Sequence, residues 1–228
     1  MSKHIASIIG ATGMIGTYLQ QVLTEDSSFD TIRILVRRPM PRPHPKIEVK
    51  LVDFSDPESV KLAIDGSDSL FCAIGTTQKK VKGDRQAYLK IDFDIPVKTA
   101  RLCKELGIDR MAIVSAVGAN SRSRNFYLKL KGHVEDAISL EPIASIHFFQ
   151  PSILLGDRQE KRPMEKFAQR MVRFVHPLMQ GGLRKYRAIE GLEVAQAMVQ
   201  SVKLGLPGIH RYTYTDIQKL AASYQPTL

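Results

Sequence analysis

The sequence predicts an α/β fold, a doubly wound and mainly parallel sheet with a small helix-rich C-terminal part. Two observations predict it. Short apolar runs rich in β-branched residues alternate with helical patterns, which is typical of strands joined by crossover helices. The first run, residues 5–9, leads directly into three evenly spaced glycines and a helical pattern. A chain of 228 residues has the size of one such domain, so we expect residues 1–228 to form a single domain.

Six continuous apolar runs are expected to be strands buried on both faces of the sheet. The helical patterns between them have apolar residues at spacings of three and four. After Pro151 two helical patterns and one apolar run follow. The predicted strands are 5–9, 32–36, 47–52, 69–74, 110–115, 144–149 and 210–214, and the predicted helices are 14–25, 57–65, 86–106, 127–140, 163–176 and 189–204.

Prolines interrupt this alternation at two places. Residues 39–45 hold four prolines, each of which fixes an extended backbone, so the second crossover is expected to be a short irregular loop. Pro96 lies inside the pattern 86–106, so this helix either kinks there or begins near Ile95.

Gly10, Gly13 and Gly16 follow the first predicted strand and open the first predicted helix. Gly10 permits a tight turn, Gly13 lets a pyrophosphate approach the backbone, and Gly16 lets the helix pack closely on the sheet. Free amides at the helix start would then face the anion. We therefore expect Gly10, Thr12, Gly13, Met14 and Ile15 to bind a dinucleotide; a tight turn without a ligand is the alternative.

The second predicted strand ends in Arg37 and Arg38, about 20 residues past the glycines. An acidic residue at this place selects NAD, whereas arginine can pair with a 2′-phosphate. The sequence therefore favours NADP(H) over NAD(H). Solvated arginines opening a loop are the alternative interpretation.

Further cofactor contacts are expected where the next strands end. Asp53 and Phe54 close the third strand near the expected adenine, although Asp53 fits a helix-capping turn equally well. Gly75 and Thr76 follow the fourth strand, where small residues let the chain pass close to the cofactor. Pro151 follows the sixth strand, at the expected nicotinamide end, or else ends that strand in a plain turn.

Tyr127 and Lys131 form a Y-x-x-x-K pair, and Ser115 ends the fifth predicted strand twelve residues before the tyrosine. Positions four apart share a helix face, so the lysine ammonium lies beside the phenol and favours its ionised form. Ligands in open α/β sheets bind beyond the strand ends, which directs Ser115 to the same crevice as the glycines. We expect Tyr127 to transfer a proton, Lys131 to bind the ribose and Ser115 to hydrogen-bond a substrate carbonyl. An ordinary surface pair on a helix is the alternative.

The formal charge of +10 is concentrated in one segment, 158–187, which has nine Lys/Arg residues and two acidic ones. Nucleic-acid binding, solubility and attraction of an anionic small molecule all fit such a segment. Because no motif for reading bases accompanies it, we expect no specific nucleic-acid binding. Arg158 and Arg162 fit closure over an anionic substrate or the cofactor phosphates, and membership of a basic surface is the alternative.

Cys72 and Cys103 fall in apolar patterns with no metal-binding spacing, so we expect two buried, reduced thiols and no metal site. No apolar stretch has the length of a membrane span, and the N-terminus reads as a strand rather than a signal peptide. We therefore expect a cytoplasmic protein with a small-molecule substrate and no membrane partner. An oligomer is possible.

These motifs together resemble those of the atypical or extended short-chain dehydrogenases/reductases. Three longer strings resemble the branch that contains the HIV Tat-interacting protein: Ser115–Ala119, Phe126–Glu135 and Gln150–Pro163. The resemblance implies a Rossmann fold that binds NADPH. The family often has an asparagine in the helix after the fourth strand; the nearest polar residue here is Asp92, which leaves that part of the proton relay open.

Three functions are consistent with these observations. The first is an NADPH-dependent oxidoreductase acting on a small carbonyl or alcohol, with 151–228 contributing the substrate side. The second is a regulatory or scaffold protein that binds NADPH without turnover. The third is an epimerase or dehydratase of nucleotide sugars, which is disfavoured because little chain follows the sixth strand. The fold does not name the substrate, because it hosts many chemistries.

Overall fold

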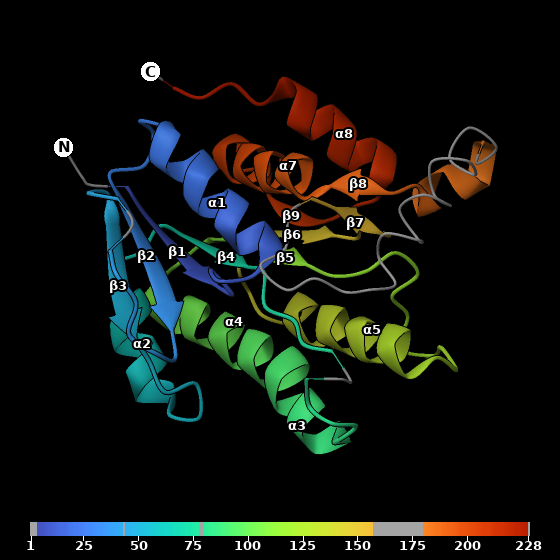
Figure 1. Cartoon of the computed structure of the whole chain (residues 1–228), viewed down its shortest axis with the longest axis horizontal. Helices are drawn as coiled ribbons and strands as arrows, with labels where there is room; N and C mark the ends of the chain where they lie inside the picture. The colour runs from blue at the N-terminus through green and yellow to red at the C-terminus, as the bar shows by residue number, and fades with distance from the viewer. Residues whose placement is uncertain (1–3, 43, 78–79, 157–179, 228) are drawn as a thin grey trace.

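The structure is a computed structural model that describes residues 4–42, 44–77, 80–156 and 180–227. Its centre is a seven-stranded sheet with the order β3-β2-β1-β4-β5-β6-β9, in which every described strand pair is parallel (Figure 1). The strands are β1 (Ile5–Ile9), β2 (Thr31–Val36), β3 (Ile47–Leu51), β4 (Ser69–Cys72), β5 (Arg110–Val114), β6 (Ser145–Phe149) and β9 (Gly208–Tyr212).

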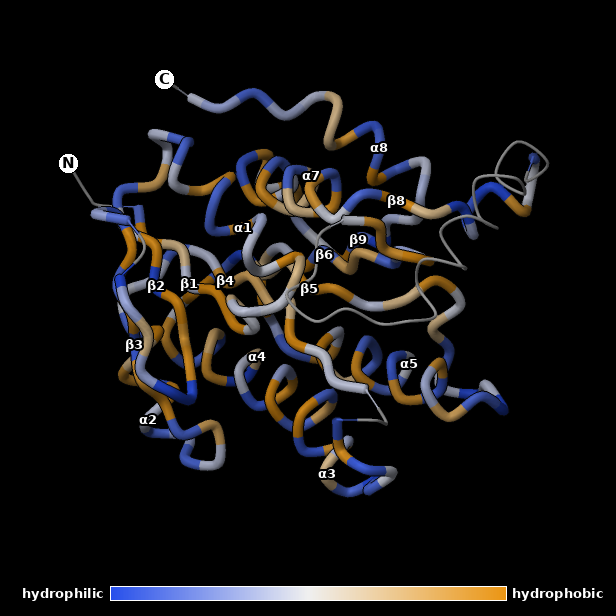
Figure 2. The backbone as a smooth tube through the Cα atoms, viewed as in Figure 1, coloured by the Kyte–Doolittle hydropathy of each residue, from blue (hydrophilic) through white to orange (hydrophobic). Residues whose placement is uncertain are grey.

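Helices cover both faces of the sheet, as Figure 1 shows. One face packs against α1 (Met14–Glu25), α7 (Gly191–Leu204) and α8 (Tyr214–Ser223). The other packs against α2 (Pro57–Ile64), α4 (Ile95–Leu106) and α5 (Phe126–Ser139). Each face has its own apolar core, and the strands between them are hydrophobic along most of their length (Figure 2). The predicted doubly wound α/β fold is confirmed.

Several strand and helix ends differ from the predicted ones. β4 ends at Cys72 rather than at residue 74, and β5 ends at Val114 rather than at 115. In both cases the chain leaves the sheet early and turns into the walls of a cavity. The last strand lies at Gly208–Tyr212 rather than 210–214.

The C-terminal part contains elements that the sequence patterns did not predict. β7 (Leu154–Leu155) and β8 (Ile189–Glu190) form a second, two-stranded parallel sheet. A 3₁₀-helix covers Gly181–Tyr186, and α8 follows β9. The predicted helix 163–176 lies outside the described residues.

The helical run predicted over 86–106 consists of three consecutive segments. α3 (Arg85–Leu89) continues through a π-helical turn (Lys90–Asp94) into α4, with Pro96 in the first turn of α4. Proline has no N–H to donate to the preceding turn, and π turns are frequent at functional sites. The helix therefore changes its hydrogen-bonding register instead of ending, and within this turn Asp92 is buried.

Two other predictions are confirmed. The described residues of the loop between β2 and β3 contain no helix. Cys72 and Cys103 are free, buried thiols, and burial raises the pKa of the Cys72 thiol to about 11. Among the described helices, none is long and apolar enough to cross a membrane.

Candidate active site

A cavity of about 700 Å³ lies beyond the carboxyl ends of β1, β4, β5 and β6. β1 and β4 are neighbours at the point where the strand order reverses, and ligands of open α/β sheets bind at this position. Ten of the predicted site residues line the cavity: Thr12, Gly13, Met14, Ile15, Gly75, Thr76, Ser115, Tyr127, Lys131 and Pro151.

The three glycines differ in what prevents a side chain at each position. Gly10 has a φ of +84°, and a Cβ there would lie 2.6 Å from the Ala73 backbone. A Cβ on Gly16 would lie 2.1 Å from the Gly10 carbonyl oxygen, so this residue sets how closely α1 packs. A Cβ on Gly13 would meet the Gly10 carbonyl only at 3.3 Å, on the cavity side. Gly10 and Gly16 are thus needed by the fold itself, whereas a Cβ at Gly13 needs only a small shift, and Gly13 lines the cavity.

The start of α1 also fits an anion. Asp56, Asp84 and Asn125 cap α2, α3 and α5 by accepting hydrogen bonds from their first backbone amides. The cap of α1 is Gly13, which offers no side-chain acceptor, and no acidic residue lies in its first turn. Its first amides therefore face the cavity uncapped, as a helix start that binds phosphate requires.

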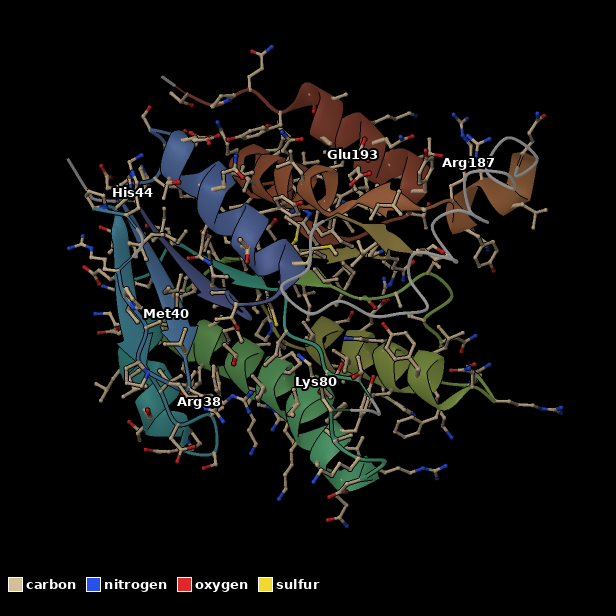
Figure 3. All side chains as sticks on the ribbon, in the orientation of Figure 1. Arg38, Met40, His44, Lys80, Arg187 and Glu193 are labelled. Carbon is tan, nitrogen blue, oxygen red and sulfur yellow. The ribbon has the colours of Figure 1, made fainter. Side chains whose placement is uncertain are left out.

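The residues predicted to read the adenosine end do not line this cavity. Arg37 and Arg38 are exposed directly after β2, and Figure 3 shows Arg38 at the tip of that strand. Asp53 is exposed and accepts hydrogen bonds from the amide and hydroxyl of Ser55, which lower its pKa. Asp53 thus forms a turn with Ser55, in agreement with the alternative interpretation. Phe54 is partly buried against the core on the face that α2, α4 and α5 cover.

The loop after β4 is held by the buried carboxylate of Asp92. Its Oδ2 accepts a 2.8 Å hydrogen bond from the Thr76 amide, and its Oδ1 is the nearest atom to a Cβ built on Gly75, at 3.6 Å. Burial raises the pKa of Asp92, and the charge of Lys131 and the Thr76 amide only partly offset this. Asp92, which the sequence offered as the nearest polar residue to the family's asparagine, therefore lies at the cavity and holds the loop after β4.

Lys131 is buried and forms an ion pair with Asp92, with 3.4 Å between Nζ and Oδ1. Tyr127, one turn earlier on α5, is 40% exposed and faces the same cavity. The predicted pair therefore shares one helix face and one cavity. His133, predicted to be a helix-surface residue, is exposed.

Ser115 follows β5 and is 5% exposed. Its Oγ donates a 2.5 Å hydrogen bond to Oε1 of Glu135, which is buried on α5. The sequence expectation was that Ser115 would donate to a substrate carbonyl, but in this structure its single proton goes to Glu135 instead.

Close backbone packing holds α5 in place. A Cβ on Gly132 would lie 2.1 Å from the Ser121 amide nitrogen and 2.2 Å from the Asn120 carbonyl carbon. The Asn120 amide in turn donates to the Leu128 carbonyl. Gly132 therefore fixes the distance between this loop and the helix that carries Tyr127 and Lys131.

Glu135 and Tyr18 are among the residues of this region that the sequence analysis did not predict. Glu135 stands four residues after Lys131, so the spacing 127, 131, 135 was the signal that could have found it. Tyr18 on α1 lines the cavity and lies against Gly156 and Gly191, where added Cβ atoms would approach its ring and hydroxyl to 3.0 Å. The sequence gives no signal for Tyr18, because Gly156 and Gly191 lie far from it along the chain.

The described residues contain no cluster of three or more His, Cys, Asp or Glu side chains that could hold a metal ion. Arg158, Arg162 and most of the basic segment 158–187 lie outside the described residues. Of that segment, the exposed Arg184 and Lys185 are described, on the 3₁₀-helix.

Comparison with known proteins agrees with this geometry. A family model described as NAD(P)H-binding matches residues 10–139. Protein FMP52 of Debaryomyces hansenii is 37% identical over 159 residues, which cover 69% of this chain and 70% of that protein. HTATIP2 of Rattus norvegicus is 31% identical over 173 residues, which cover 75% of this chain and 71% of that protein.

Solved structures share the fold at low identity. WbmH of Bordetella bronchiseptica, in complex with NAD+, superposes with a TM-score of 0.70 at 16% identity, covering 96% of this chain and 80% of that one. The oxidoreductase ylbE of Lactococcus lactis gives a TM-score of 0.65 at 16% identity, covering 96% and 95%. At this identity the likeness shows the fold alone.

One sequence prediction is contradicted by the comparisons. We expected a cytoplasmic protein, but the FMP52 relatives from Debaryomyces hansenii, Eremothecium gossypii and Candida albicans are all named mitochondrial. The expectation rested on composition and on an apolar run near residue 5, and these features report on the fold rather than on the compartment.

The resemblance to short-chain dehydrogenases/reductases is confirmed on three counts: the matched family model, the HTATIP2 relative and the fold of the solved neighbours. The matched region contains the glycine turn, Ser115, Tyr127 and Lys131. The chain belongs to the NAD(P)H-binding family, together with the FMP52 and HTATIP2 proteins, and has its Rossmann fold.

Proposed function

We propose that the protein is an NADPH-dependent oxidoreductase that interconverts a small carbonyl compound and its alcohol. One observation carries the proposal: a single cavity brings the uncapped glycine turn together with Ser115, Tyr127 and Lys131. The cofactor, when bound, supplies the hydride. The residues of this chain supply the proton, the binding contacts and the exclusion of water.

In this proposal Tyr127 is the proton donor in carbonyl reduction and the acceptor in alcohol oxidation. Its position in the first turn of α5, at the cavity wall, leaves the phenol open to a substrate. Lys131 holds the cofactor ribose and places a positive charge one turn from the phenol. Ser115 orients the substrate, and Asp92 holds the lysine in place.

NADP(H) is the proposed cofactor, because Arg37 and Arg38 follow β2 where a 2′-phosphate is read and no acidic residue stands there. The substrate side is proposed to come from residues 151–228, of which Ser152 and Leu154 line the cavity. An anionic substrate is proposed because the segment 158–187 of this part has nine Lys/Arg residues and two acidic ones. We propose no specific nucleic-acid or membrane partner.

The decisive experiment is the change Tyr127→Phe. A panel of aldehydes, ketones and quinones should oxidise NADPH above the rate without protein, and the variant should lose about 10²–10⁴-fold in kcat, the usual contribution of a general acid. NADPH affinity, measured by calorimetry, should stay unchanged because only the hydroxyl is lost. Tyr186→Phe is the matched control, since Tyr186 is also 40% exposed but is not among the residues that line the cavity.

The cofactor assignment is tested by calorimetric titration with NADPH and NADH. NADPH should bind more tightly, and the double change of Arg37 and Arg38 to alanine should weaken NADPH binding alone. NADH is the internal control for damage to the fold. Equal affinities of the unmodified protein for both nucleotides contradict the NADP assignment.

A regulatory or scaffold protein that binds NADPH without turnover is the second candidate. The observation in its favour is that the polar groups of Ser115 and Lys131 are both engaged by carboxylates of the chain itself. If Tyr127→Phe and the unmodified protein behave alike on every carbonyl compound, this function replaces the first.

A further inference from the structure

Glu135 is the centre of a buried polar network that reaches the cavity at Ser115. Its Oε1 accepts hydrogen bonds from the Ser115 hydroxyl at 2.5 Å and from the Gln150 side-chain amide at 2.8 Å. Its Oε2 accepts from Nε of Arg211 on β9, also at 2.8 Å. The residues that follow β5 and β6, together with Arg211 on β9, thus converge on one carboxylate of α5.

The network fixes which partner of the Ser115 contact donates. The Glu135 carboxylate forms an ion pair with the guanidinium of Arg211, and an ionised carboxylate has no proton to give. The bond to Glu135 therefore uses the only proton of the Ser115 hydroxyl. Toward the cavity, the Ser115 Oγ can therefore only accept hydrogen bonds, through its lone pairs.

A carbonyl oxygen opposite Ser115 would face these lone pairs with its own. A hydroxyl, an amine or an amide N–H would donate to them instead. Burying a polar group without a partner costs more than a hydrogen bond gains, so this polarity discriminates between ligands.

We propose that Glu135 is a positioning residue that makes Ser115 a hydrogen-bond acceptor, and that the site takes carbonyl substrates carrying a donor group, such as a hydroxyl, beside the reacting carbon. The proposal rests on the proposed oxidoreductase function and names its substrate class. Tyr127 gives its proton to the carbonyl oxygen, while Ser115 accepts from the neighbouring group. The role of Ser115 is thus the opposite of the carbonyl contact that the sequence suggested.

The variant Glu135→Gln tests this polarity. An amide in the same place must keep its oxygen toward Arg211, which turns its NH₂ toward Ser115 and Gln150 and releases the serine proton to the cavity. Asp136→Asn is the matched control, because it makes the same charge change at the next residue of α5, where the side chain is exposed. Ser115→Ala removes the hydroxyl altogether with little change in volume.

The first measurement is turnover of acetoin and butan-2-one with NADPH, two ketones that share a carbon skeleton and differ in the neighbouring hydroxyl. The unmodified protein and Asp136→Asn should favour acetoin in kcat/KM by about fivefold, the effect of one net hydrogen bond. Glu135→Gln and Ser115→Ala should lose this preference. A preference that persists in both variants, or its absence in the unmodified protein while both ketones react, overturns the proposal.

The second measurement does not depend on turnover. Calorimetry measures how tightly acetoin and butan-2-one bind to the protein without nucleotide, where neither ketone can be reduced. We expect the unmodified protein and Asp136→Asn to bind acetoin about fivefold more tightly, the effect of one net hydrogen bond, and Glu135→Gln and Ser115→Ala to lose this difference. If neither ketone reacts with NADPH but binding follows this pattern, the oxidoreductase function fails while the polarity of Ser115 stands. If the unmodified protein binds both ketones equally tightly, the polarity itself is wrong.

Discussion

Two buried aspartates, each paired with a lysine, lie at opposite ends of the sheet. Asp26 follows α1 and precedes β2, at the amino end of the strands, and is fully buried. Its side chain accepts hydrogen bonds from four donors, the Lys203 ammonium, the Tyr224 hydroxyl and the amides of Ser28 and Thr227. At the carboxyl end, Asp92 is also buried, and the partners it has among the described residues are the Thr76 amide and the Lys131 ammonium.

The two carboxyl groups have pKa values shifted in opposite directions. Burial raises the pKa of Asp26, but the hydrogen bonds from Lys203, Ser28 and Thr227 outweigh it and lower the value to about 2. Burial raises the pKa of Asp92, and its two partners do not outweigh it. The difference lies in the number of donors, because each hydrogen bond to the charged form favours that form.

The two aspartates differ in role: Asp26 contributes to the stability of the fold, and Asp92 contributes to the cavity. Asp26 joins α1, α7 and the residues that follow α8 through a fully satisfied network, so its ionised form stabilises the fold. Asp92 lies at a cavity with its charge incompletely compensated, and strongly perturbed groups in clefts are candidates for function. The first site should respond to substitution in stability, and the second in binding and turnover.

The largest effect is expected from Asp26→Asn. The amide presents a donor where two oxygens now accept, and it leaves Lys203 without its anionic partner. We expect a loss of about 3 kcal/mol in the free energy of unfolding, as for breaking a buried ion pair. Urea unfolding measures it, and Glu25→Gln, an exposed neighbour, is the control. NADPH affinity should not change, and a loss of it would break the division between the two ends.

The hydrogen bonds to ionised Asp26 should also make the free energy of unfolding depend on pH in the acid range. The pKa of Asp26 is about 2 in the folded state against 3.8 as its ordinary value. Its contribution is therefore present above pH 3.8 and is lost as the pH falls through about 2. The difference corresponds to about 2 kcal/mol of stability. Unfolding curves between pH 7 and pH 2 should show the gap between the unmodified protein and Asp26→Asn narrowing over this window; a gap that stays constant contradicts the ionised network.

Gly13→Ala sharpens the comparison at the other end. Its Cβ would sit 3.3 Å from the Gly10 carbonyl oxygen, a contact that a small shift relieves, but it occupies the space expected for a pyrophosphate. We expect the dissociation constant for NADPH to rise about tenfold or more, while the midpoint of urea unfolding stays within the range of ordinary surface changes. Gly16→Ala, with its 2.1 Å approach, should instead lower stability as well.

The smallest effect on stability is expected from Asp92→Asn. The raised pKa of Asp92 means that its partners do not outweigh the cost of burying its charge, so the loss in the free energy of unfolding should be smaller than for Asp26→Asn, although Lys131 loses its anionic partner. Because the folded pKa of Asp92 is raised, the folded state holds this proton more tightly. Its stabilising contribution is therefore lost as the pH rises from 3.8 through that raised value.

The pH profile of turnover distinguishes Asp92 further. Protonation of Asp92 in acid removes the ionic partner of Lys131, so kcat/KM should fall on the acid side in the unmodified protein. Asp92→Asn should lack this limb. Identical profiles for the two proteins would mean that the charge of Asp92 plays no part in the reaction.

Most of the fold could be predicted from local patterns. The alternation of apolar runs and helical patterns predicts the strands and helices, because each run is long enough to be buried. The spacing of the glycines is also predictable, because Gly13 and Gly16 both pack against Gly10, a few residues away. The pair β7 and β8 could not be predicted, because each strand has two residues and depends on a partner more than 30 residues away. The π-helical turn was not predicted either, because Pro96 is compatible with both a kink and a new helix start.

The candidate site divides in the same way. Residues that follow strands were predictable, because parallel strands end at one edge of the sheet. The partners of Ser115 and Lys131 were not, since Glu135 lies 20 residues from Ser115 and is joined to Arg211 across 76 residues. Local periodicity marks which face of a helix is buried, but not which buried polar groups meet there.

Parallel strand pairing also bears on how fast the chain reaches this state. No described pair in the sheet can form from a hairpin, because every strand meets its partner only after a crossover. The pairing of β6 with β9 joins Ser145 to Gly208 across a long intervening segment. Closing such a long loop costs conformational entropy before the contacts between the strands form. Proteins dominated by contacts between distant residues therefore fold slowly. Refolding from urea should therefore be slow, which stopped-flow measurements of the folding rate would check.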